Sequence, residues 1–260
     1  MGTATPKSNE LSEVKHHFIQ SHTITDNYNA SRFETEALLL IEQLFEKNNL
    51  LFLAGGSMLY IDAVCKGIDE MPDADQEIRL NLKLKLENEG IEGLRLQLKQ
   101  LDPDYYQIVD LKNPNRIIHA LEICLTTGKP FSSFRTNPKK IRPFIIIKIG
   151  LDCDRQILHN QINTRVDKMI EEGLEMESQK LYANRNLNAL NTVGYREFFD
   201  YFDGKISRET AIELIKRNTR RYARKQLTWF RNDQQIVWFQ PENITEIIEF
   251  IEQKAGFNNE

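Results

Sequence analysis

Most of this 260-residue chain carries apolar side chains at every third or fourth position, which is the period of an amphipathic helix. The pattern is clearest over residues 33–47 and over 154–170, where Gly173 follows as a stop signal. Further helices are predicted at 9–14, 76–89, 91–100, 116–126, 174–183, 195–203, 207–230 and 244–253. We therefore expect a chain rich in helix.

Short uninterrupted apolar runs predict strands that are buried on both faces. They are Leu50–Ala54, Phe144–Leu151 and Ile236–Phe239. Gly55 and Gly56 break the first run, and Ser57 can cap a helix that continues to about Lys66. This order of helix, strand, glycine turn and helix is typical of a parallel α/β sheet, although three strands are few for a doubly wound one.

The stretch from Gly67 to Pro114 is charged, helical and free of plausible strands, so we interpret it as a helical insertion in an α/β core. The expected organisation is a first core part at 1–66, the insertion at 67–115, and a second core part at 116–260 that includes a basic helix. No linker is long enough to separate two independent domains.

Composition is that of an ordinary globular protein, with 40% apolar and 28% charged residues. No apolar run approaches the roughly 20 residues of a membrane span, and the first residues lack the apolar core of a secretory signal. The three cysteines form no CxxC pair, and the five histidines show no metal-binding spacing. We expect a cytoplasmic protein with no metal ligands of its own and no disulfide framework.

The net charge is −4, but the segment from Lys216 to Arg231 is strongly basic. It holds Lys216, Arg217, Arg220, Arg221, Arg224, Lys225 and Arg231, and no acidic residue. Helical spacing places most of these side chains on one stripe, which would repel itself without an anion. Tyr222, Trp229 and Phe230 could stack a base. The stripe favours anion binding over a solvated face, with RNA and a phosphorylated small molecule both open.

Three further candidates are ambiguous taken alone. The glycines before Ser57 suit a bound anion at a helix start, but the spacing alone favours an ordinary strand-to-helix turn with a serine cap. Arg196 lies among aromatic residues just after a glycine, and it fits either a buried partner of an acid or a diphosphate clamp. Arg116 and His119 lie one helical turn apart, which by itself is a weak signal.

Four segments, in order along the chain, resemble bacterial tRNA dimethylallyltransferases, also called tRNA isopentenyltransferases. They are GGSMLYIDAVCKGIDEMPDADQEIR, NPNRIIHALEICLTTGKP, NTVGYREFFDYFDGKIS and TRRYARKQLTWFR, and the resemblance extends from Gly2 to about Phe239. It implies transfer of a dimethylallyl group from dimethylallyl diphosphate to N6 of the adenosine 3′-adjacent to the anticodon. It also implies an α/β core like that of P-loop nucleotide kinases, a helical insertion that grips the anticodon stem-loop, assistance by Mg²⁺, and a monomer.

The resemblance assigns roles to particular residues. Ser57 stands where the family usually has Thr, near the reacting centre, and Arg196 matches the arginine that stabilises the diphosphate leaving group, with Gly55 and Gly56 beside the diphosphate. The implied tRNA contacts are Ser57, Arg79, Asn115, Arg116, Ile117, Ile118, His119, Arg220, Arg224, Gln226, Leu227, Thr228, Trp229, Phe230 and Arg231. His119 replaces a more usual arginine, so we expect one phosphate contact to be weaker.

The family opens with a strand, a phosphate loop ending in GK[ST], and an Asp that serves as general base. This chain matches the family only after those segments, which accounts for the few strands. We therefore expect an N-terminally truncated core, weak tRNA binding, and little or no turnover by the chain as given. The alternatives are a non-catalytic tRNA-binding remnant of the enzyme and a nucleotide-kinase-like phosphotransferase; the missing GxxxxGK[ST] motif speaks against the second.

Overall fold

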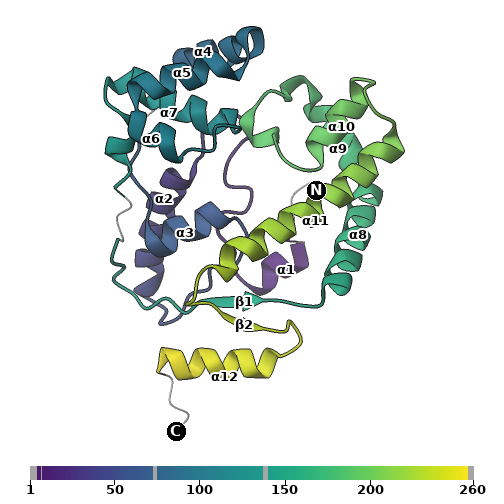
Figure 1. The fold of residues 1–260 in the computed structure, drawn as a ribbon. Helices are drawn as coiled ribbons and strands as arrows, with labels where there is room; N and C mark the ends of the chain where they lie inside the picture. Colours follow the sequence, from purple (N-terminus) through teal and green to yellow (C-terminus); the bar gives the residue numbers. More distant parts are fainter. Residues whose placement is uncertain (1–4, 7, 73–74, 137–139, 257–260) are drawn as a thin grey trace. The chain divides into compact units, whose positions relative to one another are not determined.

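The computed structural model describes residues 5–6, 8–72, 75–136 and 140–256 (Figure 1). The longer elements are α1 (Ser8–Glu13), α2 (Ala30–Phe45), α3 (Met58–Lys66), α4 (Gln76–Glu89), α5 (Ile91–Leu101), α6 (Pro103–Ile108), α7 (Pro114–Thr127), β1 (Ile149–Leu151), α8 (Arg155–Glu171), α9 (Leu174–Leu181), α10 (Tyr195–Phe202), α11 (Arg208–Arg231), β2 (Val237–Phe239) and α12 (Ile244–Ala255). Short 3-10 turns lie at Phe131–Phe134, Tyr182–Asn184 and Asn188–Leu190. The helix-rich α/β fold with a parallel sheet is confirmed.

The chain forms two compact units, and each is described by itself. Unit 1 comprises Met1–Tyr28, Phe52–Met58 and Ile145–Glu260, and unit 2 comprises Asn29–Leu51 and Leu59–Phe144. The core and insertion boundaries expected at residues 66 and 115 stay a prediction.

The sheet of unit 1 pairs β1 with β2 in parallel, with Gly150 opposite Trp238. A Cβ at Gly150 would lie 2.6 Å from the Trp238 ring, so the glycine allows the indole to lie against the strand. Helix α12 packs beside β2, where the rings of Phe239 and Phe250 are 5.5 Å apart. A parallel pair of this kind needs a long crossover connection, and helices α8 to α11 supply it.

Two predicted strands are corrected. The run Leu50–Ala54 is not a strand, and Phe52 is 78% exposed. The run Phe144–Leu151 contributes only Ile149–Leu151. An apolar run becomes a strand only where a neighbour bonds its backbone, and among the described residues β1 and β2 form the only sheet.

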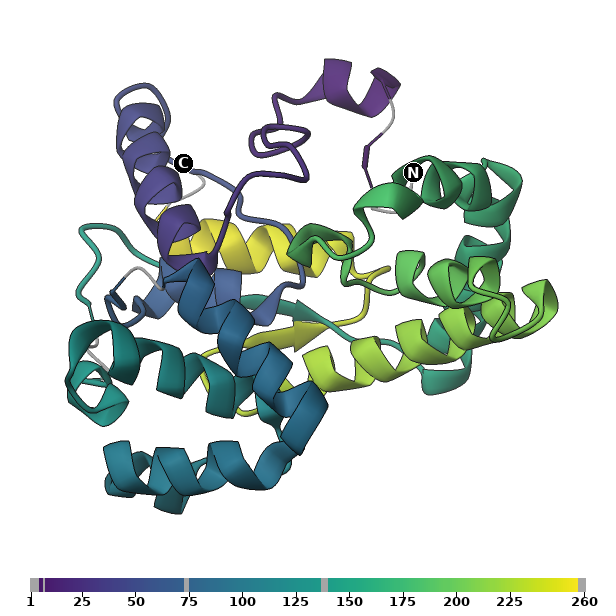
Figure 2. The same cartoon turned by 90° about the horizontal axis from the view of Figure 1, so that it is seen from above.

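Helices α8 to α11 of unit 1 enclose a core of their own, in which α11 packs against both α8 and α10 (Figures 1 and 2). Gly194 starts α10 with a φ of +106°, a conformation that favours glycine. The buried Glu197 carboxylate accepts a hydrogen bond from the Gly194 amide (2.8 Å) and another from Asn218 Nδ2 on α11 (2.7 Å). These two bonds fix the start of α10 on α11.

Unit 2 has a separate core in which α7 packs against α4 and α5 (Figure 1). Asp102, which is completely buried, caps α6 by accepting from the Tyr105 amide at 3.0 Å. The same carboxylate accepts from the amide and hydroxyl of Ser132, at 2.6 and 2.8 Å. Asp102 therefore ties the α5–α6 corner to the segment that follows α7.

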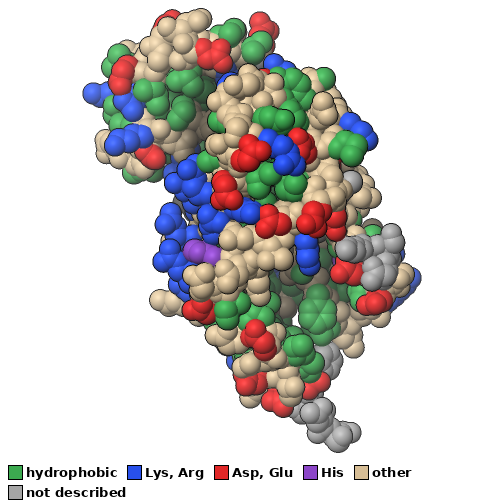
Figure 3. Space-filling view, turned by 90° about the vertical axis from the view of Figure 1, so that its right-hand side faces the viewer, with side chains coloured by type: hydrophobic (Ala, Val, Ile, Leu, Met, Phe, Trp, Pro, Cys, Tyr) green, Lys and Arg blue, Asp and Glu red, His purple; other side chains and the backbone are tan. Residues whose placement is uncertain are grey.

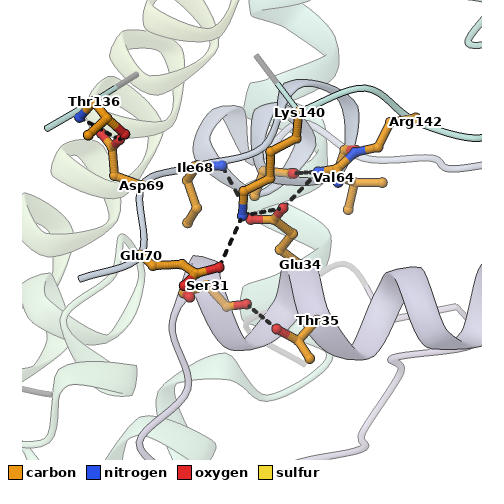
Figure 4. Close-up of polar contacts among 11 residues, drawn as sticks. Ser31, Glu34, Thr35, Val64, Ile68, Asp69, Glu70, Thr136, Lys140 and Arg142 are labelled. Atoms are coloured by element: carbon orange, nitrogen blue, oxygen red, sulfur yellow. Dashed lines mark hydrogen bonds and ion pairs between the residues drawn. The ribbon is translucent and has the colours of Figure 1, made fainter. Parts of the chain in front are cut away.

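A buried carboxylate also organises the other end of unit 2 (Figure 4). Glu34 of α2 accepts hydrogen bonds from Arg142 Nη2 at 2.7 Å, Lys140 Nζ at 3.1 Å and the Ile68 amide at 3.2 Å. Arg142 in turn donates to the carbonyls of Ala63 and Val64, at 2.7 Å each. This network joins α2, the end of α3 and residues 140–142.

Candidate functional site

The basic stripe of α11 forms one wall of a groove in unit 1 with a volume of about 490 Å³. Helix α11 contributes Arg217, Arg220, Arg221, Arg224, Leu227, Thr228 and Arg231. The facing wall, which sequence reasoning missed, comes from the end of β1 and the start of α8 and contains Asp152, Cys153, Arg155, Leu158 and His159. Figure 3 shows Lys and Arg side chains gathered on one face of the molecule.

The cations of this segment divide into paired and free groups. Lys216 forms an ion pair with Asp167 at 2.7 Å, and Arg231 forms one with Asp152, so the ends of the stripe do have acidic partners. Arg220 Nη1 donates a hydrogen bond to Asn163 Oδ1 at 2.5 Å, and this neutral partner supplies no counter-charge. By contrast, the side chains of Arg217, Arg221 and Arg224 make no hydrogen bond or ion pair with any residue that the structure describes. The middle of the stripe is therefore available to an external anion.

Cys153 is the only thiol beside the groove among the described residues. Burial, together with the carboxylates of Asp152, Glu242 and Asp154, raises the pKa of Cys153. The thiol is consequently protonated at neutral pH and is a poor nucleophile. The chemistry of this groove is that of anion binding.

Gly56, which precedes α3, contacts Gln226 of α11. Gln226 Nε2 donates a hydrogen bond to the Gly56 carbonyl at 2.6 Å. A Cβ at Gly56 would overlap the Gln226 side-chain amide, so a larger residue at this position would displace Gln226. Ser57 follows directly and is exposed. The structure thus brings together Gly56 and Gln226, two of the predicted site residues.

Arg196 lies on the outer face of α10, opposite the buried Phe198 and Phe199. Its side chain is exposed and makes no hydrogen bond or ion pair within the described part of the chain. The interpretation of Arg196 as the buried partner of an acid is therefore wrong, because its side chain is exposed and no described carboxylate pairs with it. The neighbouring residue Glu197 is buried instead. Its hydrogen bonds fix the start of α10, and the orientation of α10 places Arg196 on the outer face.

In unit 2, Arg79 of α4 and His119 of α7 share one carboxylate. Glu122 is 1% exposed, and its Oε2 lies 3.4 Å from Arg79 Nη1 and 3.8 Å from His119 Nδ1. Burial and the Arg79 charge lower the pKa of His119, while Glu122 acts in the opposite direction. His119 is therefore neutral at pH 7. Sequence reasoning missed Glu122, whose spacing of three residues from His119 was the available signal.

The segment Asn115–His119 divides by face. Asn115, Arg116 and His119 are exposed, whereas Ile117 and Ile118 are buried in the unit 2 core. The implied tRNA contacts by the Ile117 and Ile118 side chains are corrected, because those side chains point into packed protein. The exposed three remain candidates.

In the described ranges, no group of three or more His, Cys, Asp or Glu residues is placed to hold a metal ion. Mg²⁺ commonly binds one or two carboxylates together with substrate phosphates, so the donor set here does not identify a protein ligand for it. Within the same ranges, no helix is both long and apolar enough to cross a bilayer.

Comparison with known proteins found related sequences. Residues 1–233 match the family model described as IPP transferase. A curated protein named tRNA dimethylallyltransferase 1, from Bacteroides fragilis, is 52% identical over 252 residues, covering 97% of this chain and 84% of that protein.

Solved structures show the same fold. The tRNA isopentenylpyrophosphate transferase from Bacillus halodurans aligns with a TM-score of 0.69 and 35% identity, covering 98% of this chain and 83% of that one. A eukaryotic dimethylallyltransferase, whose structure was determined acting on tRNA, aligns with a TM-score of 0.69 and 22% identity over 96% of this chain and 65% of its own.

Proposed function

The chain belongs to the IPP transferase family, and from this premise we propose that it transfers a dimethylallyl group from dimethylallyl diphosphate to N6 of the adenosine 3′-adjacent to the anticodon in tRNA. The observation that carries the proposal is Arg196, a fixed, exposed arginine without a partner in the described residues. A guanidinium in that state is suited to a diphosphate.

In the proposed reaction, N6 attacks C1 of the dimethylallyl group while the bond between C1 and the diphosphate oxygen breaks. The diphosphate leaves with the bonding electrons, and the proton that N6 loses passes to solvent. Negative charge grows on the leaving oxygens, and we assign Arg196 to stabilise it. The backbone of Gly55 and Gly56 is proposed beside the diphosphate, with the Ser57 hydroxyl near the reacting centre. Mg²⁺, where present, would arrive with the diphosphate, and we assign no protein ligand to it.

The proposed tRNA contacts fall in both units. In unit 1 they are Arg220, Arg224 and the exposed members of Gln226–Arg231, which carry cationic and aromatic groups suited to phosphates and bases. In unit 2 they are Arg79, Asn115, Arg116 and His119. Arg79 and His119 are supported by their shared contact with the buried Glu122.

We further propose a monomer located in the cytoplasm. The odd number of cysteines and the lack of a CxxC pair support a reducing compartment. Sedimentation velocity of the purified chain is expected to give a single species near 30.4 kDa.

The test uses the 260-residue chain, an anticodon stem-loop with adenosine at the proposed position, and a matched stem-loop with guanosine there. The proposal predicts a preference for the adenosine RNA in binding, and a product heavier by one dimethylallyl group wherever turnover occurs. Equal binding of both RNAs with no product would refute the proposed function.

A further inference from the structure

The groove of unit 1 has a second wall that no sequence motif indicated, and Arg155 adds a cation to it. Arg155 and His159 stand one turn apart on α8 and line the groove opposite the α11 arginines. Arg155 is exposed and, like Arg221, has no hydrogen-bond or ion-pair partner in the described ranges. Unpaired arginines on both walls leave the groove with an excess of positive charge.

The acids at the groove do not remove this excess. Asp152 is paired with Arg231. Asp154 caps α8 by accepting from the amides of Gln156 and Ile157, at 2.7 and 3.2 Å. Because those amides already have a partner, side chains rather than the start of α8 must bind an anion here.

The groove also lies where open α/β folds place their ligands. Asp152 and Cys153 follow directly on Leu151, the last residue of β1, so the groove opens at the carboxyl end of a parallel strand. Ligands of such sheets commonly bind in the crevice outside that end.

Length distinguishes the kinds of phosphate ligand. The unpaired groove-lining arginines of α11 run from Arg217 to Arg224, which spans about 10 Å at a helical rise of ~1.5 Å per residue. A diphosphate can engage only part of that length. A nucleic-acid strand carries a phosphate about every 3.4 Å of helix axis and can engage all of it.

We infer that this groove holds the phosphate backbone of the RNA between two walls, with Arg155 and His159 of α8 as RNA-binding residues opposite Arg217, Arg221 and Arg224. The inference rests on the proposed function, since it names further contacts for the same RNA. Phosphate contacts position a nucleic acid without reading its sequence, so these residues set affinity rather than the choice of adenosine.

The test measures stem-loop binding by fluorescence anisotropy at several salt concentrations, for the full chain and its Arg155→Ala, His159→Ala and Arg155→Lys variants. Lys168→Ala is the matched control, because it removes a charge from an exposed position of the same helix outside the groove. Arg155→Ala is expected to weaken binding about tenfold, and equally for an unrelated stem-loop. It should also reduce the slope of log affinity against log salt by ~0.7–0.9. His159→Ala should weaken binding less, and Arg155→Lys should retain most of the affinity and the slope.

A slope for Arg155→Ala equal to that of Lys168→Ala would overturn the inference. A second arm measures inorganic pyrophosphate by calorimetry. If Arg155→Ala abolishes pyrophosphate binding but leaves RNA binding intact, the groove serves a diphosphate and the RNA assignment is wrong. Failure of the proposed function looks different, because the unmodified chain would then bind both stem-loops equally or not at all.

Discussion

Replacing Glu34 with alanine is expected to be among the most destabilising single changes in unit 2. Glu34 and Arg142 are 6% and 7% exposed, and their side chains meet at 2.7 Å. The substitution removes three accepted hydrogen bonds and leaves the buried guanidinium without its counter-charge. Removing one partner of a buried ion pair costs about 3–5 kcal/mol.

The cost is measurable by urea and thermal unfolding followed by circular dichroism. At about 2–4 °C per kcal/mol for a chain of 260 residues, the thermal transition should fall by about 6–20 °C. Glu36→Ala is the matched control, because Glu36 lies on the same helix and forms a more exposed pair with Arg32, at 3.1 Å. That change should cost about 0.5 kcal/mol. A Glu34→Ala cost no larger than the Glu36→Ala cost would refute the reasoning.

The dependence on pH provides an independent check. Burial alone raises the pKa of Glu34, but hydrogen bonds from Arg142, Lys140 and the Ile68 amide outweigh it, and the net pKa is lowered from 4.5. A lowered folded pKa means that the stabilisation is complete above 4.5 and is lost as the pH falls through the folded value. The gap in unfolding free energy between the unmodified chain and Glu34→Ala should therefore narrow below pH 4.5.

Three further changes address the candidate site. Arg196→Ala, in a version with measurable turnover, should reduce the catalytic rate about 100-fold or more with little change in stem-loop affinity, and a purely binding defect would count against its leaving-group role. His119→Arg should tighten stem-loop binding and steepen its salt slope by about 0.7–0.9, because a neutral side chain at pH 7 becomes a permanent cation. Gly56→Ala should lower thermal stability by about 1–3 kcal/mol through loss of the Gln226 hydrogen bond, and most of that cost should vanish in a Gln226→Ala background.

The helices could be predicted from sequence because their apolar period and caps are local. The predicted 154–170 becomes Arg155–Glu171, with the Asp154 side chain as its cap. Strand formation depends on neighbouring strands that no local pattern reveals. For this reason the strand predicted at Leu50–Ala54 is absent, whereas the one predicted at Ile236–Phe239 is present as Val237–Phe239. An apolar run looks the same whether or not another strand bonds to it.

The candidate site, like the fold, was predictable only in part. A cluster of arginines is visible in one segment of sequence, so the α11 wall was found. The α8 wall was missed because Arg155 and His159 are far from α11 in the sequence and belong to no recognisable motif. Glu197 was missed because its burial and its partners appear only in the fold, and Glu122 was missed although its spacing of three residues from His119 hinted at a contact. The exposure of Arg196, which sequence left undecided, depends on packing of α10 that only the fold supplies.

Helix α11 carries a charge pattern that is unfavourable for the helix alone. Free arginines at positions 217, 221 and 224 repel one another at spacings of three and four residues. The helix tolerates this repulsion because other contacts hold it in place. Lys216 pairs with Asp167, Asn218 bonds to Glu197, and Ile215 is buried in the unit 1 core. The anchoring contacts and the free cations thus occupy different faces of one helix. Local repulsion that persists in a well-anchored element is expected where a ligand of opposite charge relieves it, and a polyphosphate chain is such a ligand.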